Sequence, residues 1–164
     1  MKKKNLFIII GIILCVVLVL TIGTIILFNL IKEKESITAS EFKTIMQEKG
    51  YDVSDATGYF SQYDYINQAY IAVSDDYSYK IEFYELSNVE YAIGFFNNNK
   101  SIFEASKGNF SSETDVNIQN YSKYTLSSND KYKVISRIDN TVIYLDVDSS
   151  NKDTIKDLLD ELNY

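Results

Sequence analysis

Residues 132–147 read YKVISRIDNTVIYLDV and carry the clearest strand pattern of the chain. Apolar and polar side chains alternate on both sides of Asp139 and Asn140, and alternation with a period of two is typical of a β-strand with one buried face. Asp and Asn both tolerate positive φ, so a two-residue Asp-Asn connection favours a type I′ turn. The stretch therefore predicts an antiparallel hairpin with strands at 132–138 and 141–147.

The segments that flank this hairpin show two patterns, strand alternation and capped helices. Alternation predicts further strands at 51–57, 69–73, 77–85 and 121–126. Capping residues followed by apolar stripes predict helices that begin near Thr38, Ser87 and Ser150. The segment 107–120, which is rich in Ser and Asn, is predicted to be a loop.

Hairpins combined with helices indicate the α+β class, here an antiparallel sheet with helices packed on one face. A strand hairpin followed by a helix occurs at 68–104 and again at 121–162, so a twofold strand-hairpin-helix repeat is one interpretation. The side chains predicted to form the core include Phe42, Ile81, Phe83, Phe96, Val134, Leu145 and Leu158.

Fourteen tyrosines occur in a chain that has no His, Pro or Trp. Tyrosine is a good strand former, and most of these residues fall in predicted strands. Tyr132 shares a face with Val134 and is predicted to be buried. Tyr84 and Tyr144 lie opposite the apolar faces of their strands and are predicted to face solvent.

Four tyrosines lie in or next to the segment 58–67, which has no clear period: Tyr59, Tyr63, Tyr65 and Tyr70. Aromatic side chains with a polar tip are common in loops that bind glycans or proteins, because the ring packs while the hydroxyl forms hydrogen bonds. These four residues are the candidate contact surface.

An uncharged and mostly apolar run, LFIIIGIILCVVLVLTIGTIILFNLI, extends from Leu6 to Ile31. About 20 apolar residues suffice to cross a bilayer as a helix, so the run predicts a transmembrane anchor in contact with membrane lipid. A cleavable signal peptide, whose apolar region usually has about 7–15 residues, is the weaker alternative, and cleavage is left open. A lipid on Cys15 is weaker still, because the residues before it are not small.

The lysines that flank this run predict the orientation of the chain. Three precede the run and two follow it, so the positive-inside rule places the N-terminus in the cytoplasm and the C-terminal part outside the cell membrane. The predicted organisation is a tail at 1–5, a transmembrane helix at 6–31, a connector at 32–37 and an extracytoplasmic domain at 38–164.

The part of the chain after the predicted anchor is acidic. Residues 35–164 contain 11 basic and 22 acidic residues, a formal charge of −11. Such a charge repels phosphate backbones, so nucleic acid is not an expected partner. The only cysteine is Cys15, so no disulfide is available to this part.

Neither an enzyme, a metal site nor a cofactor site is expected. Without histidine, and without cysteine beyond the anchor, the common base–nucleophile pairs and zinc sites cannot be built there. The segment 146–157 partly matches a calcium-binding loop, but Asn151 replaces the turn glycine and Asp157 the final glutamate. The acids at its start also fit the solvent face of a strand.

The short lysine tail, the single apolar helix, and the segments YSYKIEFYEL and NTVIYLDVD together resemble small single-pass membrane proteins of Clostridium-like Gram-positive bacteria. The resemblance implies an envelope location and no activity. We therefore expect a non-enzymatic domain that binds a protein partner. The alternative is a domain that binds a cell-wall saccharide through the four loop tyrosines.

Overall fold

The computed structural model describes residues 14–24 and 32–164 of the chain. Residues 14–24 are helical, and the chain divides into two compact units between Glu33 and Lys34. Leu6 and Ile31, which bound the predicted anchor, lie outside the described residues. Within the described ranges, no helix has the length and the hydropathy that a membrane crossing requires.

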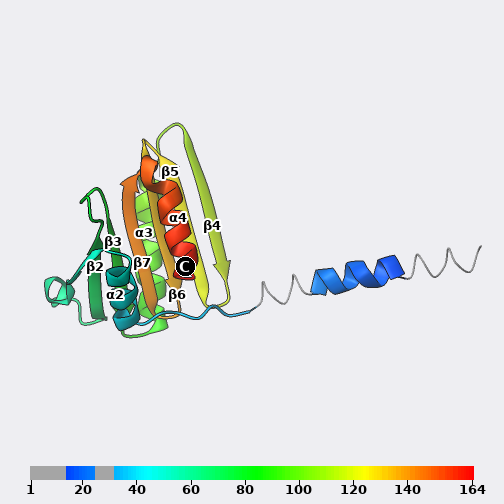
Figure 1. Cartoon of the computed structure of the whole chain (residues 1–164), viewed down its shortest axis with the longest axis horizontal. Coiled ribbons are helices and arrows are strands. Elements are labelled where there is room, and N and C mark those ends of the chain that lie inside the picture. Colours follow the sequence, from blue (N-terminus) through cyan, green and yellow to red (C-terminus); the bar gives the residue numbers. More distant parts are fainter. Residues whose placement is uncertain (1–13, 25–31) are drawn as a thin grey trace, which may run out of the picture. The chain divides into compact units, whose positions relative to one another are not determined.

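The second unit is built on one antiparallel sheet of seven strands (Figure 1). The strands are β1 (Asp52–Asp55), β2 (Ile66–Val73), β3 (Lys80–Leu86), β4 (Ser111–Ile118), β5 (Tyr121–Ser128), β6 (Lys131–Ile138) and β7 (Thr141–Asp148). Their order in the sheet is β1-β2-β3-β7-β6-β5-β4, so β3 and β7 join the two halves. The α+β class and the antiparallel sheet are confirmed.

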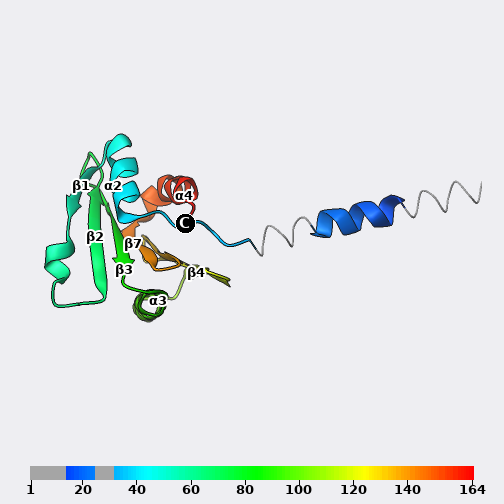
Figure 2. The same ribbon diagram turned by 90° about the horizontal axis from the view of Figure 1, so that it is seen from below.

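Helices cover both faces of the sheet, so the prediction that they pack on one face is wrong. Seen along the sheet in Figure 2, α3 (Val89–Ala105) lies on one side, and α2 (Ala39–Glu48) and α4 (Lys152–Glu161) lie on the other. Two short 3-10 helices, η1 (Thr57–Phe60) and η2 (Ser149–Asn151), complete the unit.

Two hydrophobic cores form, one on each face of the sheet. In the first core, Ile81 and Phe83 of β3 pack with α2 and α4. In the second, Tyr84 and Leu86 of the same strand pack with Phe96 and the rest of the inner side of α3. The side chains predicted to form the core are all buried: Phe42, Ile81, Phe83, Phe96, Val134, Leu145 and Leu158.

Tyr84 and Tyr144 were predicted to face solvent, and the second core shows why this is wrong. Tyr84 is 5% exposed, and Tyr144 is half-buried with its ring 5.2 Å from that of Phe103. Both residues lie on the face opposite Ile81 and Ile143, as the alternation predicted. That face is not open to solvent, because α3 covers it. Tyr132 is buried as predicted.

The hairpin that β6 and β7 form is confirmed, with Ile138 paired to Thr141. Its predicted turn type is wrong, since of the two turn residues only Asp139 has positive φ (50°). The type I′ pattern occurs instead between β5 and β6, where Asn129 and Asp130 both have positive φ (52° and 58°). The Asn140 side chain donates a hydrogen bond to the Leu86 carbonyl at 2.8 Å, an additional bond between β7 and the end of β3.

The strand β4 was predicted as a loop. It pairs along its whole length with β5 and has no strand on its other side. Nearly all of its residues are exposed, and charged side chains alternate along it. On its α3 face, Glu113 pairs with Lys107, and Asp115 pairs with Lys100. Charges of this kind on an edge strand disfavour pairing with other chains.

The three helices of the second unit begin in three different ways. Thr38 and Glu41 form the predicted capping box of α2. For α3 the capping residue is Asn88, whose side chain accepts a hydrogen bond from the Tyr91 N–H, and not the predicted Ser87. The residue before α4, Asn151, makes no capping hydrogen bond, because η2 already leads into the helix.

The helices α3 and α4 also decide the question of a repeat. A twofold axis that exchanged the antiparallel strands β3 and β7 would run perpendicular to the sheet and would leave each helix on its own face. Since α3 and α4 lie on opposite faces, no such axis relates the two hairpin-helix units. The order of a hairpin followed by a helix does occur twice, as β2-β3-α3 and as β6-β7-α4, but no twofold symmetry relates the two copies.

The first residues of the second unit are fixed to the sheet. The Lys34 N–H donates to Asn120 Oδ1 at 3.1 Å, and Asn120 Nδ2 donates to the Lys34 carbonyl at 2.8 Å. The Lys34 ammonium also lies 4.0 Å from the centre of the Tyr121 ring and donates to the Asn163 carbonyl at 2.7 Å. Part of the predicted connector is thus part of the domain.

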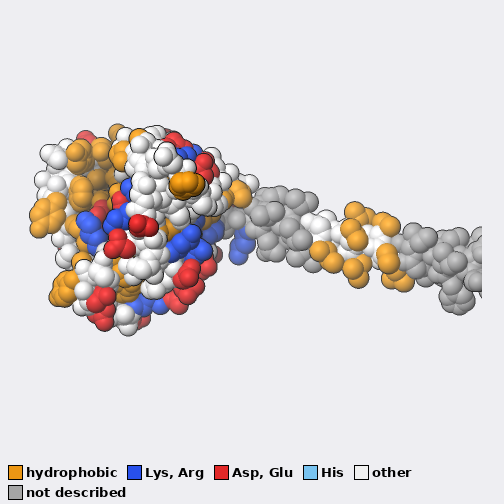
Figure 3. All heavy atoms as spheres, turned by 90° about the horizontal axis from the view of Figure 1, so that it is seen from above, with side chains coloured by type: hydrophobic (Ala, Val, Ile, Leu, Met, Phe, Trp, Pro, Cys, Tyr) orange, Lys and Arg blue, Asp and Glu red, His pale blue; other side chains and the backbone are white. Residues whose placement is uncertain are grey.

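Acidic and basic side chains lie interspersed on the face of the unit shown in Figure 3. Two of the ion pairs join neighbouring strands: Lys133 with Asp146 at 3.0 Å, and Lys131 with Asp148 at 2.5 Å. Exposed pairs such as these add about 0–1 kcal/mol each to stability. Their main effect is to offset locally the excess of negative charge.

Candidate functional site

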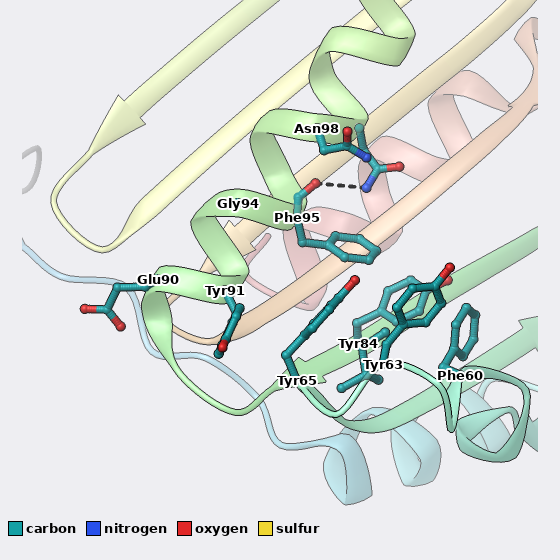
Figure 4. A pocket seen from close by; sticks show the side chains of 11 residues that line it. Phe60, Tyr63, Tyr65, Tyr84, Glu90, Tyr91, Gly94, Phe95 and Asn98 are labelled. Atoms are coloured by element: carbon teal, nitrogen blue, oxygen red, sulfur yellow. Dashed lines mark hydrogen bonds between the residues drawn. The ribbon is translucent and has the colours of Figure 1, made fainter.

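A cleft of about 590 Å³ opens between α3, β3 and the segment that precedes β2 (Figure 4). Its volume lies in the range typical of small-molecule sites, about 300–1,000 Å³. Six aromatic side chains, three polar ones, one isoleucine and one glycine line it: Phe60, Tyr63, Tyr65, Ile66, Tyr84, Glu90, Tyr91, Gly94, Phe95, Asn98 and Asn99. We call it the tyrosine cleft.

Three parts of the chain supply the walls of the tyrosine cleft. Phe60 ends η1, and Tyr63 and Tyr65 follow it in the loop that leads into β2. Tyr84 comes from β3 and points towards the α3 side because of the strand alternation. On α3, Tyr91 and Phe95 are four residues apart, so that their side chains lie on one side of the helix.

The rings in the cleft form two connected groups. In the first, Tyr65 stacks on Tyr91 with centroids 5.2 Å apart and planes at 18°, and Tyr63 lies 5.6 Å from Tyr65 at 47°. In the second, Tyr84 lies 5.4 Å from Phe60 at 79° and 4.8 Å from Phe95 at 45°. The rings therefore stand at several angles to each other and form walls around the hollow.

Tyr84 connects the cleft to a partly buried carboxylate. Its hydroxyl donates a hydrogen bond to the carboxylate of Glu82, which also pairs with Lys80 at 2.7 Å. Burial, and then the nearby Glu82 charge, raise the pKa of Tyr84 above its ordinary value. The phenol is therefore neutral at any physiological pH, and its proton is committed to Glu82.

The other polar groups of the cleft lie on α3. Asn99 Nδ2 donates one of its two hydrogens to the Phe95 carbonyl at 2.9 Å, so the Asn99 oxygen and the second N–H are left for another partner. Asn98 lies next to it on the same wall, and Glu90 lies at the opposite end of the helix segment (Figure 4). The carboxylate of Glu90 points away from the rings (Figure 4).

The four tyrosines of the candidate contact surface do not lie together in the structure. Tyr63 and Tyr65 line the cleft. Tyr59 is 82% exposed on η1 and is not part of the lining. Tyr70 lies on the other face of the sheet, where it packs against the first core with the Lys43 ammonium 5.8 Å from its ring centre.

Most of the cleft was not predicted from the sequence. The contribution of α3 had a detectable signal, because Tyr91, Phe95 and Asn98 follow the helical spacing of four and three residues. That stripe runs beside the buried one formed by Ala92, Phe96 and Phe103. Tyr84 and Phe60 had no such signal, since their place depends on contacts between segments distant in sequence.

The structure gives ordinary roles to the acids of the calcium-like segment. Asp146 and Asp148 pair with lysines of β6, as described above. In the described part of the chain, no three acidic or sulfur-bearing side chains come together in a way that could hold a metal ion.

Comparison of the chain with protein-family models, with curated proteins and with solved structures gave no match.

Proposed function

We propose that the second unit is a non-enzymatic binding module and that the tyrosine cleft takes a saccharide of the cell wall. The observation that carries the proposal is the composition of the cleft: six aromatic side chains with amide and hydroxyl groups at their margins. Aromatic faces pack against the C–H faces of sugar rings, while amides and phenols form hydrogen bonds with sugar hydroxyls.

The proposed setting is the outer side of a Gram-positive cell membrane. The apolar run from Leu6 to Ile31 would hold the module there, with the N-terminus in the cytoplasm. A module fixed close to the membrane would meet the inner layer of the wall. The Lys34–Asn120 hydrogen bonds favour this arrangement, because they shorten the free connector after the run.

Sedimentation with cell-wall sacculi stripped of protein tests the proposal. We expect the full-length protein, kept in a detergent without a sugar headgroup, to sediment with the sacculi. Tyr65→Ala should weaken binding roughly 5–30-fold, as expected when an aromatic contact worth about 1–2 kcal/mol is lost. Tyr59→Ala is the matched control, because Tyr59 comes from the same segment but lies outside the cleft.

Two results would contradict a saccharide-binding cleft. One is wild-type protein that stays in the supernatant. The other is equal loss of binding in Tyr59→Ala and Tyr65→Ala. Thermal unfolding of both variants checks that each is folded, since Tyr65 also packs against the second core.

A protein partner is the second candidate. It is favoured by three exposed apolar side chains of α3: Val89, Ile93 and Ile102, which are 39%, 41% and 54% exposed. The side chains of α3 that are buried are those of Ala92, Phe96 and Phe103. Sedimentation that is absent with stripped sacculi but present with protein-containing sacculi would favour this candidate.

A further inference from the structure

Two side-chain oxygens of the tyrosine cleft can serve as hydrogen-bond acceptors for a ligand. The Asn99 amide gives one of its two N–H hydrogens to the Phe95 carbonyl and keeps its oxygen as an acceptor. Tyr84 gives its proton to Glu82, which leaves the lone pairs of its hydroxyl. The carboxylate of Glu90 points away from the rings (Figure 4) and is not counted among these acceptors. A ligand that supplies hydrogen-bond donors matches the Asn99 and Tyr84 oxygens.

The charges and the aromatic rings of the cleft also favour a ligand that carries a positive charge. Neither a lysine nor an arginine is among the residues that line it. The faces of aromatic rings are electron-rich, and a cation within about 6 Å of a ring centre is attracted to them. Rings at 45°, 47° and 79° to one another can present several faces or edges to one group. The formal charge of −11 on residues 35–164 adds a long-range attraction for cations.

We infer that the saccharide taken by the tyrosine cleft carries a free, protonated amino group. This inference rests on the proposed function and narrows its ligand class to amino sugars without an N-acetyl group. An ammonium group supplies three donors, has no acceptor, and is a cation. An N-acetyl group is neutral and adds a carbonyl acceptor. Sugar acids and phosphate-bearing polymers are excluded, because no basic side chain lines the cleft.

Two tetrasaccharides of the same linkage test the inference: β-1,4-linked glucosamine and β-1,4-linked N-acetylglucosamine. Binding of each to the full-length protein is measured by calorimetry at pH 6 and low salt, where the amino groups are largely protonated. The detergent is a polyoxyethylene ether, which contains neither a sugar nor an amine. We expect the glucosamine tetramer to bind about tenfold more tightly, and added salt to reduce this preference.

The glucosamine tetramer is a polycation and could also bind elsewhere on the acidic surface of the protein. Variants that keep the net charge of the protein control for such binding. Gly94 lies on the cleft wall, and a Cβ placed there meets no atom within 4 Å, so Gly94→Leu adds a bulky side chain to this wall without a clash at Cβ. Gly58 also faces open space but lies outside the lining, and Gly58→Leu is the control. Gly94→Leu should abolish binding of the glucosamine tetramer, and Gly58→Leu should not change it.

The possible results separate the inference from the proposed function. If the N-acetylated tetramer binds as tightly or more tightly, the inference is wrong and the proposed function stands. If the glucosamine tetramer binds Gly94→Leu as well as it binds wild type, its binding is not in the cleft and the inference is wrong. If neither tetramer binds and sacculi do not retain the protein, both are wrong.

Discussion

Gly94 lines the tyrosine cleft and is also a residue of a helix. It lies in the middle of α3, where glycine is unfavourable because it loses more backbone freedom on folding than any other residue. No neighbour occupies the space that a side chain would take. Packing therefore does not require a glycine here.

We expect Gly94→Ala to raise the free energy of unfolding by about 0.5–1 kcal/mol, because alanine is the better helix former. The melting temperature should rise by roughly 2–4 °C. Thermal unfolding followed by circular dichroism measures the shift. Gly50→Ala is the matched control: Gly50 has φ of +87°, so the same substitution there should lower stability. A destabilised Gly94→Ala would show that the α3 wall is closed at this point.

The limits of sequence-based prediction are visible in single residues. Alternation correctly gave the direction of Tyr84 and Tyr144, because the pleat of a strand fixes it locally. It did not give their burial, which depends on α3 crossing the second face. The buried Arg137 is a similar case: it is 3% exposed and donates to Ser122 and to the Asp139 carbonyl. Nothing in its own strand predicts these partners.

At the scale of elements, helix starts were predicted where the capping pattern acts locally. The capping box of α2 is such a case, since Thr38 and Glu41 exchange hydrogen bonds within one turn. The bonds from Thr38 hold the pKa of Glu41 below its usual value. A carboxyl group with a lowered pKa stabilises the folded state above its unfolded pKa of about 4.3, and this contribution is lost as pH falls through the folded value.

We expect Thr38→Ala to lower the free energy of unfolding by about 1 kcal/mol at neutral pH, because an N–H at the start of α2 loses its partner. Asn88→Ala should cost a similar amount at α3. Asn151→Ala is the control and should be nearly neutral, since Asn151 makes no capping hydrogen bond. The urea unfolding midpoints of the three variants measure these differences in stability. Equal losses at positions 38 and 151 would contradict the assignment of the caps.

The strand β4 shows why another element could not be predicted. Its sequence, SSETDVNI, has one half-buried residue, Val116, so no apolar alternation distinguishes it from a loop. The segment is a strand because the Gln119–Asn120 turn places it antiparallel to β5, whose edge would otherwise have no partner. The hydrogen bonds that define β4 therefore come from its neighbour and not from its own side chains.

At the scale of the whole unit, the prediction of one covered face followed from the combination of hairpins and helices that is typical of the α+β class. The chain instead distributes its helices over both faces and forms two cores. This arrangement also creates the tyrosine cleft, because α3 covers the sheet only in part and leaves the Tyr84 end open to the loop before β2. The site thus depends on an arrangement that local patterns do not determine.

The last prediction is that a fragment comprising residues 34–164 folds alone in one cooperative transition. Both cores lie within it, and it is one of the two compact units. A fragment that begins at residue 38 should be less stable, because it lacks the hydrogen bonds from Asn120 and Asn163 to residues 34 and 35. Each net hydrogen bond is worth about 0.5–1.5 kcal/mol, so the difference should be measurable in urea.

Thermal unfolding of the same fragment in EDTA and then in millimolar calcium should give the same midpoint, since Asp146 and Asp148 are paired with lysines. A midpoint raised by roughly ten degrees in calcium would reveal an ion bound only to the folded state. Equal stability of the two fragments would instead show that the bonds to the connector contribute nothing.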